Sequence, residues 1–69
     1  MLRLGIYRHY KGNLYEVIGV AIHSETTEEV VVYRPLYGEQ RLWVRPLSMW
    51  DNVIDGLGVK RFAFVSDPV

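Results

Sequence analysis

The sequence predicts an all-β fold: a small five-stranded barrel, SH3-like or of a related type, with one short helical turn. Short stretches rich in valine, isoleucine and aromatic residues recur at close spacing, separated by glycine, proline and asparagine. No window sustains the 3.6-residue apolar period of a helix with a cap at each end. A closed barrel is favoured because closure removes the exposed edges that a tiny open sheet would carry.

Five strands are expected, in residues 6–10, 14–22, 29–34, 41–45 and 61–65. The second and third have the strongest β propensity of the chain, and Pro35 closes the third. The fourth alternates strictly, with Leu42 and Val44 on one face and Trp43 and Arg45 on the other. We expect the Leu42 face to contribute to the core and the Trp43 face to meet solvent or a ligand.

Three smaller features complete the predicted fold. Gly19 inside the second strand indicates a bulge or bend, because a glycine there otherwise only weakens the strand. Residues 46–50 fit a single helical turn, since proline suits a first helical position. Val53 and Ile54, followed by Asp55-Gly56, predict a short strand and a hairpin turn before the last strand. The expected core consists of Val17, Val31, Tyr33, Val44, Phe62 and Phe64.

Length and composition predict one small β-barrel domain over residues 1–69. The absence of cysteine excludes a disulfide framework and thiolate zinc sites. Lysine plus arginine and aspartate plus glutamate number 8 each, so no global positive field favours a long nucleic acid as partner. The first residues lack a signal-peptide pattern, and the apolar stretches are too short to cross a bilayer. We therefore expect a cytoplasmic protein with no membrane partner, as a monomer or weak homodimer.

The residue types that support metal or catalytic chemistry form no convincing pattern. His9 and His23 are the only histidines, and without cysteine they supply too few ligands for a metal site, so no cofactor is expected. Ser24 follows His23 directly, and neighbouring strand residues point to opposite faces, which disfavours a nucleophile–base pair. The crowded carboxylates nearby are typical of a solvated loop tip. No catalytic residue is assigned.

Two features favour a binding site instead. A polar loop, residues 23–29, joins the two best strands, and loops of this kind commonly hold binding residues. Aromatic and basic side chains also recur along the strands, where a planar guanidinium can hold an anion and an aromatic face can stack on a ring. The alternative is that the aromatic residues fill a small core and the arginines cover its rim.

A long motif closely resembles a known bacterial family. It comprises Gly5-Ile6-Tyr7-Arg8-His9-Tyr10-Lys11-Gly12, Tyr15-Glu16-Val17-Ile18-Gly19-Val20-Ala21, His23-Ser24-Glu25-Thr26, Glu28, Val32-Tyr33, Leu36-Tyr37-Gly38 and Leu42-Trp43-Val44-Arg45-Pro46. The family is known as domain of unknown function 1653, and the resemblance runs from Gly5 to about Met49, with a weaker echo over residues 53–62. It implies a small standalone domain with no established role, and hence no catalytic assignment. The family tends to have phenylalanine at the position of Trp50 and a basic or small residue at that of Ile22, differences that concern packing.

We therefore expect a ligand-recognition module that binds a compact anionic ligand or a peptide through an aromatic, arginine and histidine surface. The expected site consists of His9, Tyr10, Lys11, His23, Ser24, Glu25, Thr26, Trp43 and Arg45. Arg45 would hold the anionic group, Trp43 or Tyr10 would stack, and the loop hydroxyls would orient the ligand. The alternatives are a small hydrolase or nucleotide-processing enzyme that uses His23 with Glu25 or Glu28, and a structural dimerisation domain with an apolar edge strand.

Overall fold

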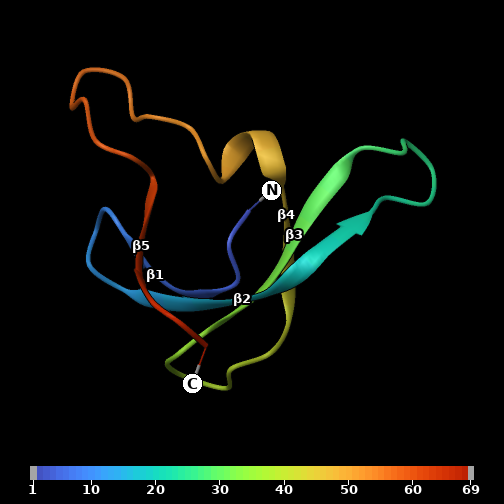
Figure 1. Cartoon of the computed structure of the whole chain (residues 1–69), viewed down its shortest axis with the longest axis horizontal. Helices are drawn as coiled ribbons and strands as arrows, with labels where there is room; N and C mark the ends of the chain where they lie inside the picture. The colour runs from blue at the N-terminus through green and yellow to red at the C-terminus, as the bar shows by residue number, and fades with distance from the viewer. Residues whose placement is uncertain (1, 69) are drawn as a thin grey trace.

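Five antiparallel strands form one sheet in the computed structural model, which describes residues 2–68 (Figure 1). They are β1 (Gly5–His9), β2 (Leu14–Ile22), β3 (Glu29–Pro35), β4 (Trp43–Pro46) and β5 (Phe62–Ser66), and the 3-10 turn η1 (Leu47–Met49) follows β4. The strand order is β4-β3-β2-β1-β5, so the first strand lies between the second and the last. The predicted all-β class, five strands and single helical turn are confirmed.

The predicted irregularity at Gly19 is also confirmed. Val17 pairs with Tyr33, but Gly19 pairs with Val32, so Ile18 is an extra residue in β2. Such a bulge bends its strand and increases the local twist. Beyond it, β2 and β3 continue as a hairpin whose loop, residues 23–28, extends past the rest of the molecule on the right of Figure 1.

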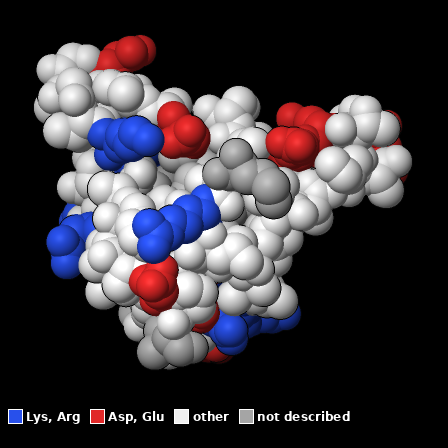
Figure 2. All heavy atoms as spheres, viewed as in Figure 1, with Lys and Arg blue, Asp and Glu red and all other residues white. Residues whose placement is uncertain are grey.

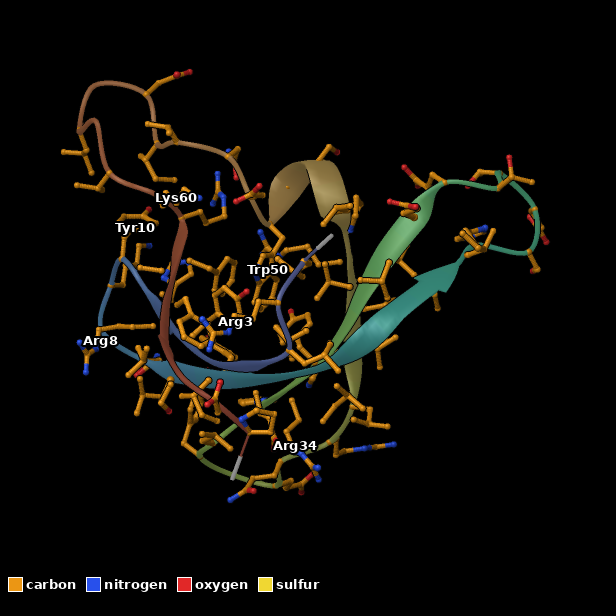
Figure 3. All side chains as sticks on the ribbon, viewed as in Figure 1. Arg3, Arg8, Tyr10, Arg34, Trp50 and Lys60 are labelled. Carbon is orange, nitrogen blue, oxygen red and sulfur yellow. The ribbon has the colours of Figure 1, made fainter. Side chains whose placement is uncertain are left out.

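The core lies on the inner face of the sheet, the face against which Trp50 packs (Figure 3). Trp50 follows η1 and is fully buried, with its indole stacked on the Phe62 ring at 3.7 Å between centroids. The buried cluster consists of Tyr7, Val17, Val31, Trp50 and Phe62. Of the predicted core residues, Val17, Val31 and Phe62 are buried, Tyr33 is half-buried, and Val44 and Phe64 are 62% and 37% exposed. Trp50, which was not among the predicted core residues, is instead one of the largest fully buried side chains.

The faces of β4 are the reverse of those predicted. Trp43 pairs with Tyr33 and Arg45 with the buried Val31, so Trp43 and Arg45 project from the inner face. Leu42 and Val44 point outward, and both are 62% exposed. Alternation in the sequence shows that Leu42 and Val44 lie on the face opposite to Trp43 and Arg45. Which of the two faces is the inner one depends on how β4 pairs with β3.

Residues 51–60 make a hairpin-like excursion between η1 and β5, as the sequence predicted. Val53 and Lys60 form an isolated antiparallel bridge, and the Ile54 amide donates to the Val59 carbonyl at 2.8 Å. The excursion then returns the chain to β5, whose pairing with β1 completes the sheet. No helix among residues 2–68 is long and apolar enough to cross a membrane.

Candidate functional site

The nine residues expected to form the site fall into three separate groups. His9, Tyr10 and Lys11 lie at the turn between β1 and β2, residues 23–26 lie in the projecting hairpin loop, and Trp43 and Arg45 lie on β4. Figure 1 shows the hairpin loop and the β1–β2 turn on opposite sides of the molecule. The fold therefore does not gather all nine residues around one ligand.

The hairpin loop is held together by its own polar groups. The imidazole Nδ1 of His23 accepts hydrogen bonds from the backbone amides of Glu25 (3.2 Å) and Thr26 (3.3 Å), and the Thr26 hydroxyl accepts one from the Glu28 amide. Neither carboxylate of the proposed acid–base pairs is bonded to His23 within the described part of the chain. This geometry favours a loop-ordering role for His23 and Thr26.

His9 and Arg45 do approach each other, although they come from different strands. The His9 ring lies 4.9 Å from the centroid of Phe62, and the Arg45 guanidinium carbon lies 5.5 Å from the same centroid. Arg45 also donates to the Met49 carbonyl at 3.2 Å, so its fork is partly occupied within the protein. Burial, and then the charges of Arg45, Arg61 and Lys11, hold the pKa of His9 below its usual value.

Trp43 belongs to a different feature, an open cavity of about 440 Å³ at the end of the sheet where β3 connects to β4. We call this cavity the aromatic pocket. Its walls include Tyr15, Tyr33, Tyr37 and Trp43, with Glu39 and Arg41 among the polar lining residues. These side chains come from β2, β3, β4 and the β3–β4 connection.

The aromatic pocket has a packed wall of three tyrosines. The Tyr15 ring lies edge-on to those of Tyr33 and Tyr37, with centroids 5.7 and 5.9 Å apart. The Tyr15 and Tyr37 hydroxyls share a hydrogen bond of 3.0 Å, which holds the two rings together. Trp43 is 58% exposed, a large apolar surface for a side chain on the inner face. The arrangement leaves ring faces available for a planar or apolar group.

Sequence reasoning identified Trp43 but missed Tyr15, Tyr37, Glu39 and Arg41 as residues of one cavity. One signal was present: a hairpin centred on Gly38 places Tyr33 directly opposite Trp43, as observed. Gly38 has φ 64°, a left-handed conformation suited to glycine in a tight connection. Tyr15 could not be found in this way, because its place in the wall depends on the register between β2 and β3, which the bulge at Gly19 shifts.

We expect Tyr15 to remain neutral well above the usual range for tyrosine. Burial and the hydrogen bond with Tyr37 raise the pKa of Tyr15 to about 12, from the 10.0 of a freely exposed tyrosine. A raised pKa in the folded state gives stability that is complete below pH 10.0 and is lost as the pH rises toward about 12. Thermal unfolding at increasing alkaline pH measures the loss of stability, and an ultraviolet titration of tyrosine ionisation measures the raised pKa.

Tyr37→Phe removes the hydrogen bond and should lower the Tyr15 pKa, so that ionisation begins at lower pH. Tyr10→Phe is the matched control, because Tyr10 lies at the β1–β2 turn and outside the aromatic pocket. If both variants ionise identically, the contact between the Tyr15 and Tyr37 hydroxyls does not control the titration.

No group of three or more histidine, aspartate or glutamate side chains among residues 2–68 is placed to hold a metal ion. The candidate site therefore consists of aromatic rings and the polar groups of Arg41 and Glu39. Such a site can hold a ligand by stacking and charge.

Comparisons with known proteins agree on one family. The model of the family described as "Protein of unknown function (DUF1653)" matches residues 5–64. The structure is similar to a crystal structure of a DUF1653 protein from Bordetella bronchiseptica, with a TM-score of 0.86 and 42% sequence identity. That match covers 99% of this chain and 92% of the other. No curated protein matches the chain.

Proposed function

The chain belongs to the DUF1653 family, and we propose that it is a ligand-recognition module whose aromatic pocket binds a compact group combining a planar ring with an anion. Such a group is present in a free aromatic carboxylate, and also at the carboxyl end of a peptide whose last residue is aromatic. The observation that supports the proposal most strongly is the convergence of four aromatic side chains on one open cavity.

The planar part of the ligand would lie against Trp43 and the tyrosine wall. Trp43 exposes more than half of its surface, and tryptophan buries a large apolar area when a ligand covers it. The tyrosine wall is already ordered by ring contacts and by the bond between the Tyr15 and Tyr37 hydroxyls, so little side-chain freedom is lost on binding. This preorganisation favours recognition of a small ligand.

The anionic part of the ligand would lie at Arg41. Its guanidinium offers a planar fork that matches a carboxylate. Arg41 replaces Arg45 in this role, because Arg45 donates to the Met49 carbonyl and lies over Phe62. Glu39 also lines the pocket and repels an anion, so Glu39→Gln should strengthen the binding of a carboxylate.

A titration with N-acetyltryptophan, followed by amide and indole NMR signals, tests the proposal. We expect the Trp43 indole signal and the amides of residues 36–43 to shift, and the uncharged N-acetyltryptophan amide to bind more weakly. Trp43→Ala should weaken binding about tenfold or more, since about 1.4 kcal/mol of lost stacking corresponds to that factor. The affinity of a short peptide that ends in tryptophan with a free carboxylate is then compared with that of N-acetyltryptophan. The tighter of the two shows whether the pocket prefers a peptide end or a free aromatic carboxylate.

Arg41→Gln should abolish the preference for the acid over the amide, while Arg3→Gln is the matched control, because Arg3 does not line the aromatic pocket. Equal affinity for acid and amide in the wild type would remove Arg41 from the site. Unchanged binding in Trp43→Ala would show that the aromatic pocket is not the site. Shifts confined to the outward Leu42 and Val44 would instead favour self-association through the β4 edge.

We also propose that the sheet forms a small barrel of the SH3-like type, as the sequence suggested. The order β4-β3-β2-β1-β5 and the 3-10 turn before the last strand support this. Closure would bring β4 against β5, the two ends of the strand order, and the Arg45 guanidinium already lies over the Phe62 ring across that gap. The bulge in β2 supplies the bend that a closed sheet of this size needs.

A further inference from the structure

A second cavity, of about 310 Å³, lies beside β5 and the end of β1. We call it the β5 cleft. It is lined by Arg8, His9, Tyr10, Lys60, Phe64 and Val65 among others. Figure 3 shows Arg8, Tyr10 and Lys60 on the same side of the molecule, beside β1 and β5. The cleft shares no residue with the aromatic pocket.

The wall of the β5 cleft is apolar with positive charge at its edge. Phe64 and Val65 are 37% and 44% exposed and offer apolar surface. The lining contains Arg8 and Lys60 and, within the described residues, no aspartate or glutamate. Figure 2 shows acidic residues beside the basic ones on this side of the molecule as well as on the right, so the positive charge belongs to the lining of the cleft and not to the whole side. The overall neutral chain therefore has a local site of positive charge.

The charges at the cleft are available to a ligand. Arg8 forms no ion pair within residues 2–68. Lys60 pairs with Asp51 at 3.0 Å, but both side chains are more than half exposed, and exposed pairs of this kind are weak. Lys11 adds a further charge close by, with its ammonium 5.8 Å from the centroid of the Tyr10 ring. An incoming anion would thus meet cationic groups that the protein itself does not neutralise strongly.

We propose that the β5 cleft is a second, independent binding site, which takes an organic anion with a small apolar body. The apolar body would lie against Phe64 and Val65, and the anionic head would lie between Arg8 and Lys60. The shared chemistry is a singly or doubly charged head on an apolar group. The two sets of lining residues do not overlap, so the proposal does not depend on the function assigned to the aromatic pocket, although the His9 and Tyr15 rings connect the two sites at 6.3 Å between centroids.

His9 lines the cleft, and its pKa reports the binding of an anion there. Its neighbours from every packed element are cationic or aromatic: Lys11 in the turn, Arg45 on β4, Arg61 before β5, and Tyr15 on β2. The cations help to keep its pKa low in the free protein, after burial as the first cause. An anion in the cleft offsets their charge and should raise that pKa. His23, on the distant hairpin loop, is a matched control within the same molecule.

The experiment is an NMR pH titration of both imidazoles with and without benzenesulfonate, which stays negatively charged throughout the range. Sodium chloride at equal ionic strength is the reference, and inorganic sulfate tests the head group alone. We expect benzenesulfonate to raise the His9 pKa measurably, sulfate to raise it less, and His23 to remain unchanged. Arg8→Gln should reduce the His9 response severalfold, whereas Arg41→Gln, in the aromatic pocket, should leave it intact.

Each other outcome counts against the second site. Equal shifts at His9 and His23 would indicate general ion screening. A His9 response that survives Arg8→Gln but disappears in Arg41→Gln would place the anion in the aromatic pocket. No response at any concentration that leaves the protein folded would mean that the cleft does not bind this class of ligand. An equal response to sulfate and benzenesulfonate would remove the apolar contact from the proposal.

Discussion

Trp50→Ala is expected to unfold most of the protein at room temperature. Trp50 is fully buried, stacks on Phe62 with the ring planes only 2° apart, and meets the Tyr7 ring edge-on at 5.6 Å. Replacement of a buried tryptophan by alanine costs about 3–5 kcal/mol. That loss equals the whole stability expected of a domain this small, since a single core below about 70–80 residues rarely supplies more than about 3–5 kcal/mol. Thermal and urea unfolding, followed by circular dichroism, measures the change.

Two variants make this test specific. Trp50→Phe keeps a stacked ring, and it removes an indole N–H that has no hydrogen-bond partner among the described residues, so its cost should be clearly smaller. Trp43→Ala removes the other tryptophan, which is 58% exposed, and should leave the thermal midpoint almost unchanged. If Trp50→Ala were as stable as Trp43→Ala, the buried cluster around Trp50 would be wrong.

Gly5→Ala is expected to be similarly damaging, through the backbone. Gly5 has φ +142°, a conformation that side-chain-bearing residues rarely adopt, and this alone costs about 1–3 kcal/mol. An added Cβ would also collide with the carbonyl oxygen of Ser66 and approach the Phe64 ring to 3.0 Å. The collision involves backbone, so β5 would have to move away from β1. Amide hydrogen exchange should then show loss of protection in both strands.

A series of glycine variants separates the two causes. Gly12→Ala has a positive φ of +111° but open space around the new Cβ, so it should show the backbone cost alone. Gly19→Ala has neither a positive φ nor a nearby atom and should be almost neutral, despite its place in the bulge. If Gly5→Ala cost no more than Gly12→Ala, the close contact between Gly5 and β5 would not be a constraint on the fold.

Most strands could be predicted because their information is local. Residues 14–22 and 29–34 combine high β propensity with clear boundaries, and the glycine inside the second strand marked its bulge correctly. Trp50 was missed as the centre of the core because it follows a 3-10 turn, where no periodic pattern indicates burial. Phe64 alternates properly with its neighbours, but β5 is an edge strand, so an inner-face residue there keeps part of its surface exposed.

The candidate site was harder to predict because it depends on register between strands. Trp43 was predicted as a ligand-binding residue and is 58% exposed, but the other aromatic residues of the pocket come from β2, β3 and the β3–β4 connection. His23 and Thr26 were predicted as binding residues from their chemical types, whereas their side chains accept hydrogen bonds from backbone amides of the same loop. The residue types of a loop do not show whether its polar side chains bond within the loop or bind a ligand.

The pairing of β1 with β5 has a consequence for how the chain folds. The other three pairings join strands that follow each other in sequence, so each needs only a short loop to close. The β1–β5 pairing instead joins Ile6 to Ser66, so it closes a loop that contains nearly the whole chain. The entropy lost on closing that loop opposes the pairing until the contacts between the two strands have formed. Phe62 arrives with β5, so Trp50 gains its stacking partner at that step. We therefore expect the docking of the last strand, which completes the sheet and the core together, to be the slow step of folding.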